Sequence, residues 1–249
     1  MNILINGACG RMGSELCALL ACGYRGHTVT AAVDPAAADG SHICHTLELC
    51  PQSVDVLIDF SHHSAAPVLC AYVLQQKLPA VIATTGYTDA ELALIRHAAE
   101  TVPIFLAANL SLGIALLNQL ALTAAAALPE AEIEIIELHH SKKRDAPSGT
   151  AQKLAEELCA LRPEGRVVCG AGCGVRTPDE IRLHSLRMGD HAGSHTVCFG
   201  SNEQTLTLTH TAHSPRIYAV GAIRAAEFLL TQKPGLYGMP QLLSHLHIL

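Results

Sequence analysis

The chain has 249 residues, which suits one large domain or two modest ones, and its 49% apolar and 15% charged residues indicate a folded globular protein rather than a disordered one. Aromatic residues make up only 4%, without Trp, so aromatic platforms for stacking nucleic-acid bases are not expected. The formal net charge of -6 argues against a general polyanion binder but leaves room for a local cationic site. The 15 His and 10 Cys residues are the unusual counts.

The chain carries no recognisable targeting or membrane segment. Its first residues lack a basic region followed by an apolar one, and the apolar stretch 112–128 is interrupted by Asn118, Gln119 and Thr123. No two cysteines form a C-x-x-C pair, so we expect reduced, structural thiols in a cytoplasmic protein. A zinc site at Cys169 and Cys173 is a weak alternative, and no metal is predicted.

The first part of the chain alternates short apolar strands with helices. Strands are predicted at 2–6, 28–33, 54–60, 80–84 and 104–107, and helices at 14–22, 64–76 and 88–99. Near-continuous apolar strands alternating with helices are typical of a parallel sheet covered on both faces. The predicted fold is therefore α/β, with a Rossmann-type doubly wound sheet.

The pattern changes after Asn109. A helix at 112–127, a strand at 132–140 and a helix at 149–161 precede segments with a period of two residues at 181–188, 194–200 and 204–210. These segments predict a second α+β domain with a mainly antiparallel or mixed sheet. An amphipathic helix at 217–230 is expected to return to the first domain, so the predicted domains are 1–109 with 217–249, and 110–216.

A glycine-rich turn joins the first strand to the first helix. Gly7, Gly10 and Gly13 follow the spacing of a turn whose backbone amides cradle a pyrophosphate at a helix N-terminus. Asp34, at the end of the second strand, is placed to accept hydrogen bonds from a ribose; the alternative is a turn residue before Pro35. Residues 34–43 hold no Lys or Arg for a 2′-phosphate, so NADH should bind at least as well as NADPH; Arg11 leaves the preference open.

The densest chemical signal lies at 137–151, with the sequence ELHHSKKRDAPSGTA. Two His and three cationic residues stand at the end of a strand, directly before a Ser-Gly-Thr helix start. Point charge from Lys143 and free amides at the helix start suit a small dianion. The alternative is a solvated basic loop in which Ser148 is an ordinary N-cap.

This segment resembles the signature E-x-H-H-x-x-K-x-D-x-P-S-G-T-A of the 4-hydroxy-tetrahydrodipicolinate reductase (dihydrodipicolinate reductase) family, with every fixed position present. Further family features recur in order at 7–13, 59–61, 84–86, 107–113, 187–189, 193–195 and 221–224. The resemblance implies that NADH or NADPH reduces a cyclic imine dicarboxylate to tetrahydrodipicolinate with loss of water, in the diaminopimelate route to lysine. It also implies a homotetramer, joined through the second, substrate-binding domain, with no nucleic-acid or membrane partner.

The resemblance assigns roles to individual residues. His139 and Lys143 match the catalytic positions, with His139 as the proton donor. The substrate-binding positions are His140, Ser148, Gly149, Thr150 and Arg224. The glycine turn and the resemblance together predict cofactor contacts from Gly7, Ala8, Cys9, Gly10, Arg11, Met12, Asp34, Ala83, Thr84, Thr85, Ala107, Ala108, Asn109 and Leu110.

Two other classes of protein share part of this pattern. One is a different two-domain NAD(P)-dependent amino-acid or semialdehyde dehydrogenase, but the semialdehyde type needs an activated Cys, and the cationic segment contains none. The other is a non-enzymatic NADH-sensing regulator, which would normally bring a basic DNA-binding helix. The sequence shows no such helix.

Overall fold

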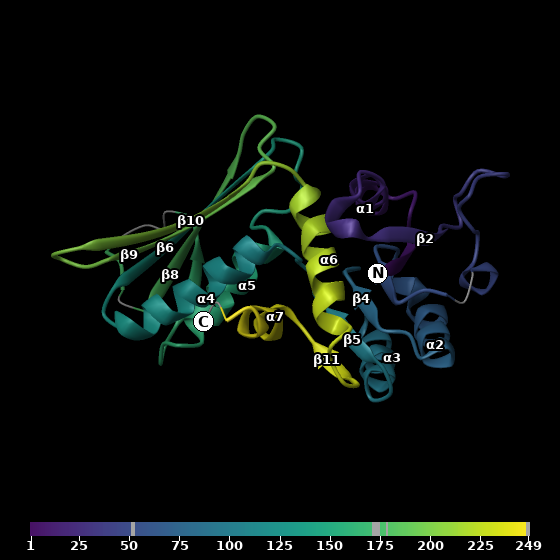
Figure 1. Ribbon diagram of the computed structural model, residues 1–249. Coiled ribbons are helices and arrows are strands. Elements are labelled where there is room, and N and C mark those ends of the chain that lie inside the picture. The colour runs from purple at the N-terminus through teal and green to yellow at the C-terminus, as the bar shows by residue number, and fades with distance from the viewer. Residues whose placement is uncertain (51–52, 171–174, 178, 248–249) are drawn as a thin grey trace. The chain divides into compact units, whose positions relative to one another are not determined.

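The computed structural model describes residues 1–50, 53–170, 175–177 and 179–247 (Figure 1). Its internal contacts divide the chain into two compact units. Unit 1 comprises Met1–Leu112 together with Arg216–Leu249, and unit 2 comprises Gly113–Pro215. The predicted division at 109/110 and 216/217 lies within three residues of these limits.

Unit 1 contains a six-stranded parallel sheet in the order β11-β5-β4-β3-β1-β2. Its strands are β1 (Asn2–Asn6), β2 (Thr28–Val33), β3 (Val56–Asp59), β4 (Ala80–Ile82), β5 (Pro103–Leu106) and β11 (Gly235–Tyr237). All residues of β3 and β4 are buried, as expected for central strands covered on both faces. The doubly wound prediction is confirmed.

Helices cover both faces of this sheet. They are α1 (Arg11–Ala21), α2 (Ala66–Gln76), α3 (Asp89–Ala99), α6 (Arg216–Leu229) and α7 (Met239–His245). Side chains of α2 and α3 share one core cluster with alternate residues of the strands, while α6 packs on α1 and on β3 to β5. Phe228 of α6 meets Phe105 of β5 edge to face, with ring centroids 6.1 Å apart. Helix α6 therefore belongs to unit 1.

Unit 2 contains a five-stranded sheet in the order β10-β9-β6-β8-β7. Its strands are β6 (Glu132–His139), β7 (Arg166–Cys169), β8 (Glu180–Arg187), β9 (Gly193–Gly200) and β10 (Thr205–Ala212). The sheet is mixed, because β9 pairs antiparallel with β6 and β10 whereas β8 pairs parallel with β6 and β7. Alternating polarity shows that one face is buried but does not reveal strand direction, so the parallel half was not evident from the sequence.

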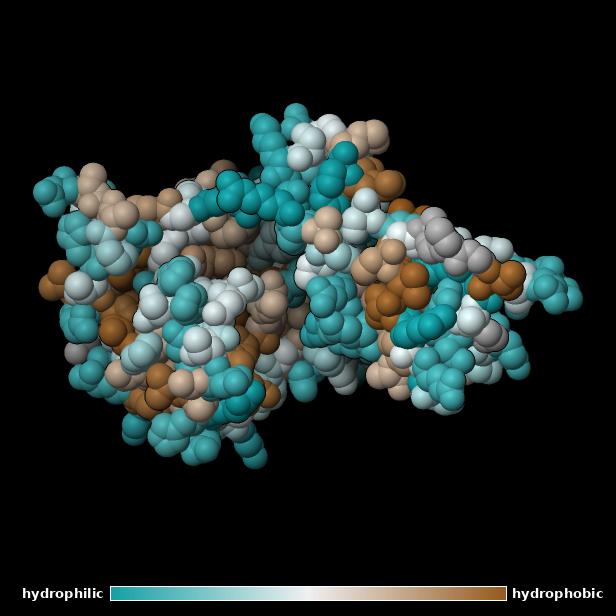
Figure 2. Space-filling view, turned by 180° about the vertical axis from the view of Figure 1, so that it is seen from behind, coloured by the Kyte–Doolittle hydropathy of each residue, from teal (hydrophilic) through white to brown (hydrophobic). Residues whose placement is uncertain are grey.

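One face of this sheet is covered by α4 (Leu112–Ala127) and α5 (Gly149–Cys159), as Figure 1 shows. Ala and Leu side chains of both helices pack on Ile133, Ile135, Leu183 and Phe199. The opposite face carries the alternate residues, among which Ile136 and Leu186 are 37% and 50% exposed. On the side of the molecule seen in Figure 2, hydrophobic residues lie in separate patches among hydrophilic ones.

Among the strands and α-helices of the described residues, the edge strands β7 and β11 and the helix α7 were not predicted. Elements of three to seven residues offer too few periods of a hydrophobic pattern to be recognised from sequence alone. In the described ranges, none of the helices has both the length and the apolar character that a bilayer crossing requires.

Candidate active site and cofactor site

The glycine turn between β1 and α1 is tightly packed against its neighbours. Gly7 has a φ of +82°, which favours glycine, and a Cβ there would lie 2.7 Å from the backbone of Phe60. A Cβ on Gly13 would lie 2.0 Å from the carbonyl oxygen of Gly7, so any larger residue would push α1 away from the turn. Gly10 is the N-cap of α1, and Cys9 and Arg11 beside it are exposed. The first amides of α1 are thus positioned to bind phosphate oxygens.

Asp34 follows β2 and is joined directly to this turn. Its Oδ2 accepts a hydrogen bond from the Cys9 amide at 2.9 Å, and its Oδ1 accepts one from the Ala36 amide at 2.9 Å. Each carboxylate oxygen keeps a second lone pair. The structure therefore combines the two interpretations of the sequence: Asp34 shapes the turn and retains acceptor capacity for a ribose.

The other predicted cofactor residues follow strands of the same sheet. Ala83, Thr84 and Thr85 come after β4, and residues 107–110 come after β5. Carboxyl ends of parallel strands lie at one edge of the sheet, where open α/β folds bind their ligands. Thr84 differs from its neighbours because it is buried, and its hydroxyl donates to Asp59 Oδ2 at 2.7 Å.

In unit 2, His139 ends β6 with its ring close to a buried carboxylate. Its Nδ1 lies 2.8 Å from Oε2 of Glu137, whose side chain is fully buried. Oε1 of Glu137 accepts hydrogen bonds from the Ser148 amide at 2.9 Å and from Arg187 Nη2 at 2.8 Å. Glu137 therefore joins the proposed proton donor, the start of α5 and the end of β8.

The surroundings of Glu137 and His139 set their charge. Burial acts to raise the pKa of Glu137, but hydrogen bonds from Ser148 and Arg187 help to outweigh it, and the pKa falls to about 2. Burial lowers the pKa of His139; the Glu137 charge opposes this effect, and the cationic Lys143 and Arg187 reinforce it. The net result is an anionic Glu137 beside a largely neutral His139 at pH 7.

Lys143 and the start of α5 lie close to this pair in the sequence. Lys143 Nζ forms an ion pair with Asp145 Oδ1 at 2.8 Å. Ser148 is the N-cap of α5, and its Oγ accepts from the Ala151 amide at 3.3 Å. Gly149 is exposed and Thr150 is partly exposed, so the helix start is accessible while Ser148 faces inward.

His195 of β9 completes the buried cluster. Its ring packs edge to face on that of His139, with centroids 5.2 Å apart, and its Nε2 lies 3.4 Å from Ser148 Oγ. Burial lowers the pKa of His195 to about 4, and the nearby His139 contributes. His195 is therefore neutral at pH 7 and forms one wall of the site.

Ligand atoms of Glu137, His139 and His195 lie within 4.8 Å of one another, a spacing that a metal ion could bridge. The guanidinium of Arg187, 2.8 Å from Glu137, opposes a cation at this position. The cluster thus suits proton transfer better than metal binding. The cysteine pair considered as a zinc site includes Cys173, which lies outside the described residues.

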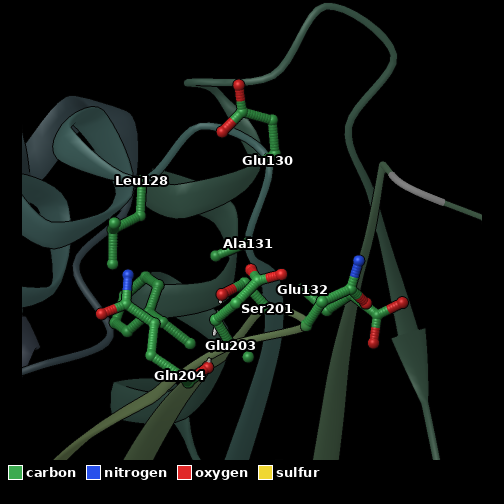
Figure 3. Close-up of a pocket in the computed structure, with 10 residues that line it drawn as sticks. Leu128, Glu130, Ala131, Glu132, Ser201, Glu203 and Gln204 are labelled. Carbon is green, nitrogen blue, oxygen red and sulfur yellow. Dashed lines mark hydrogen bonds between the residues drawn. The ribbon is translucent and has the colours of Figure 1, made fainter.

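A pocket among the described residues lies away from this cluster. It has a volume of about 610 Å³ and lies at the Glu132 end of β6, seven residues from His139. Figure 3 shows Glu130, Glu132 and Glu203 around it, together with Leu128, Ala131, Ser201 and Gln204. Three carboxylates make this pocket unsuitable for a dianion.

The structure thus brings the predicted residues together in two groups. The carboxyl edge of the unit 1 sheet carries the predicted cofactor residues, and Glu137, His139 and Ser148 form a contact network in unit 2. Arg224 lies within α6 of unit 1, half-buried, and its substrate role stays a prediction. The roles of Glu137, Asp59 and Arg187 were not predicted, although all three lie in family-like segments; their contacts appear only in the folded chain.

Comparison with known proteins agrees with this arrangement. Residues 1–110 match the family model described as "Dihydrodipicolinate reductase, N-terminus", and residues 113–243 match "Dihydrodipicolinate reductase, C-terminus". The 4-hydroxy-tetrahydrodipicolinate reductases of Caldanaerobacter subterraneus subsp. tengcongensis and Akkermansia muciniphila are 39% and 41% identical to this chain, respectively. The two alignments cover 97% and 98% of this chain and 98% of each relative.

A solved structure is similar over the same length. Dipicolinate-bound dihydrodipicolinate reductase from Paenisporosarcina sp. TG-14 has a TM-score of 0.82 and 26% sequence identity, and the match covers 97% of this chain and 98% of that one. Both halves of the chain and nearly all of its length are therefore accounted for by one family. The chain belongs to the dihydrodipicolinate reductase family.

Proposed function

We propose that the chain reduces 4-hydroxy-tetrahydrodipicolinate to tetrahydrodipicolinate, with loss of water, and that His139, Lys143 and the start of α5 form its substrate site. As a member of its family, the chain is an NAD(P)H-dependent oxidoreductase of lysine biosynthesis through diaminopimelate. The observation that best supports this proposal is the contact between Glu137 and His139 at the end of β6. It lies directly before the cationic segment and the N-terminus of α5 in the sequence. A different NAD(P)-dependent dehydrogenase or an NADH-sensing regulator would not explain why both halves of the chain match dihydrodipicolinate reductase models.

The substrate carries two carboxylates, and the described groups provide matching positive potential. The exposed Gly149 and the partly exposed Thr150 begin α5, where the helix dipole favours an anion. Lys143 adds a full charge that is paired with the exposed Asp145 in this structure. A substrate carboxylate would replace Asp145 as the partner of Lys143, because both are anions and Asp145 remains in contact with water.

The reaction also needs a proton for the ring. Bound NADH or NADPH supplies a hydride to C4 of the unsaturated ring, and C3 must then be protonated. We propose His139 as the donor, because its Nδ1 lies 2.8 Å from the Glu137 carboxylate and its Nε2 remains for the substrate. We assign Nε2 as the atom that gives up the proton.

Glu137 is a positioning residue in this proposal. Nδ1 of His139 lies 2.8 Å from Oε2 of Glu137, which is ion-pair distance without the alignment of a hydrogen bond. A rotation of the ring would let an N–H on Nδ1 donate to this oxygen, and Glu137 would then orient the ring and leave Nε2 as the exchanging atom. Its negative charge also favours the imidazolium form that donates the proton.

Substrate charge would complete this arrangement. In the free enzyme, Lys143 and Arg187 help to keep the pKa of His139 below its ordinary value. A bound dianion offsets these cations and raises the pKa of His139, so the ring takes up a proton when substrate binds. Proton uptake is thereby linked to substrate binding.

Nucleotide preference follows from the segment after β2. Asp34 retains acceptor capacity, and residues 34–43 contain no Lys or Arg that would favour a 2′-phosphate. We propose that NADH binds at least as well as NADPH, with the phosphates at the glycine turn and the nicotinamide beside the segments 83–85 and 107–110.

We further propose a cytoplasmic homotetramer assembled through the unit 2 sheet. The face of this sheet that α4 and α5 leave uncovered carries the exposed Ile136 and Leu186. Light scattering on the purified protein tests the proposal, and a monomer across a concentration series would contradict it.

The activity is tested by mixing aspartate semialdehyde, pyruvate and the condensing synthase with this protein and NADH or NADPH. Loss of absorbance of the reduced cofactor, dependent on the synthase, is the expected result. Dipicolinate, a planar dianionic analogue, should compete with the substrate. Unchanged absorbance with both nucleotides would refute the proposed reaction.

A further inference from the structure

We propose that Asp59 is a positioning residue for the NAD(P) cofactor, because it ties together the three backbone segments that form the floor of the cofactor cleft. The inference rests on the family's use of NAD(P) and on the proposed placement of the cofactor, but not on the assignment of substrate residues. Asp59 itself makes no contact with the cofactor in this proposal.

The Asp59 carboxylate is fully buried and collects hydrogen bonds from three segments. Its Oδ1 accepts from Asn6 Nδ2 at 2.7 Å and from Ser61 Oγ at 2.6 Å, and its Oδ2 accepts from Thr84 Oγ1 at 2.7 Å. Asn6 ends β1, and Ser61 and Thr84 follow β3 and β4. One side chain therefore links the carboxyl ends of three adjacent strands.

These bonds lie where the order of the strands reverses. From β1 the chain passes through α1 to β2 on one side, and β3 and β4 then follow on the other side of β1. Open α/β sheets bind their ligands in the crevice outside this reversal point. The bond between Asn6 and Asp59 spans it, so Asp59 lies directly beneath the expected path of the cofactor.

The glycine turn packs on the segment that Asp59 holds. A Cβ on Gly7 would lie 2.7 Å from Phe60 and 2.8 Å from the Ser61 amide nitrogen, so the turn touches this backbone. Ser61 is held by Asp59 through its hydroxyl, and the Phe60 amide donates to the carbonyl of Asn6 at 2.9 Å. Movement of residues 60–61 would therefore displace the pyrophosphate-binding turn.

The same carboxylate controls the segment after β4. Thr84 is buried and its hydroxyl donates to Asp59 Oδ2, while the amide of the preceding Ala83 donates to the carbonyl of Asp59 at 3.0 Å. Valine at position 84 would have nearly the same volume as Thr84 but no hydroxyl, so the hydrogen bond to Asp59 would be lost. The Asp59–Thr84 bond thus determines the shape of the loop expected beside the nicotinamide.

The cost of burying Asp59 argues against a role in packing alone. Burial raises the pKa of Asp59, and the bonds from Ser61, Thr84 and Asn6 only partly offset this effect. A buried carboxylate is a poor stabiliser compared with apolar residues of similar volume, but it fixes the direction of its donors. Its three donors all belong to segments that border the cleft.

The test compares Asp59→Asn with Asp55→Asn in the full-length protein. Asp55 lies just before β3, at the opposite end, where its Oδ2 accepts from the Asn2 amide at 2.6 Å, so it is a matched control. We expect Asp59→Asn to weaken NADH binding, measured by fluorescence or calorimetry, about tenfold or more, since a charged hydrogen-bond acceptor is lost. Asp55→Asn should change NADH affinity less than about twofold, because it alters an exposed contact.

Steady-state kinetics and melting separate positioning from general destabilisation. The KM for NADH should rise in Asp59→Asn, while kcat at saturating NADH changes much less. A fall in kcat without a change in KM, or a change in affinity no larger than that of an equally destabilised Asp55→Asn, would overturn the inference.

Thr84 variants decide the question if Asp59→Asn does not fold. Thr84→Val should weaken NADH binding more than Thr84→Ser, which keeps the hydroxyl. Equal affinities in the two variants would overturn the inference. Wild-type protein that fails to bind NADH would instead count against the proposed function, so the two failures are distinguishable.

Discussion

Oε2 of Glu137 lies 2.8 Å from Nδ1 of His139, with both residues buried at the end of β6. The two side chains leave the strand two positions apart and therefore on the same face of the sheet. A second Glu–His contact, from Glu134 Oε2 to His184 Nε2 at 2.6 Å, lies on the other face of the same sheet and is partly exposed. The two contacts differ in burial, and the exposed one offers a natural control.

Glu137→Gln should lower turnover and shift its pH dependence. The anionic Glu137 raises the pKa of His139, so its neutral replacement lowers that pKa, and fewer molecules carry the donor proton at pH 7. The alkaline limb of the kcat profile should move down by about one pH unit. Glu134→Gln should leave the profile in place, and an unshifted Glu137→Gln profile would argue against the positioning role.

His139→Gln and Lys143→Ala should each lower turnover by about 100-fold or more while NADH binding persists, because general-acid catalysis and charge stabilisation act on the reacting ring. Turnover is measured in the coupled synthase assay, and NADH binding by fluorescence. Normal turnover in either variant would show that its assigned role is wrong.

Gly13→Ala should destabilise the protein and weaken NADH binding together. The added Cβ would lie 2.0 Å from the Gly7 carbonyl oxygen, so the start of α1 must move away from β1. Overpacking of this kind costs about 1–3 kcal/mol. Thermal unfolding and NADH titration check the prediction; Gly23→Ala is a useful comparison, since a Cβ there meets nothing within 4 Å and the cost comes from its φ of +72° alone.

Asp34→Asn should reduce the preference for NADH over NADPH. The side chain of Asn has one acceptor oxygen in place of two, so it cannot accept hydrogen bonds from the Cys9 and Ala36 amides and from ribose hydroxyls as well. The substitution also removes the negative charge that repels a 2′-phosphate. We expect NADH affinity to fall about tenfold, with a smaller loss for NADPH. Equal losses for the two nucleotides would indicate that Asp34 acts only in the turn.

Local sequence patterns predicted most of the secondary structure and the positions of the site segments. The strands before Gly7, Asp34 and Thr84 were recognisable because short apolar runs end in glycine or polar residues. The mixed pairing of the unit 2 sheet could not be recognised from the sequence. Strands β6, β8 and β9 have the same alternating pattern, although β8 runs parallel to β6 and β9 runs antiparallel to it. The short β7, β11 and α7 lacked sufficient periodicity.

The sequence by itself determined the family, the doubly wound sheet, the glycine turn and the His-His-Lys segment, because each is encoded by residues close together in the chain. The tertiary structure decided which distant groups meet: Arg187 on Glu137, His195 on His139, and Asn6 and Thr84 on Asp59. Those contacts set charge and orientation through burial and hydrogen bonding. Neither property exists until separate strands are brought together in a sheet.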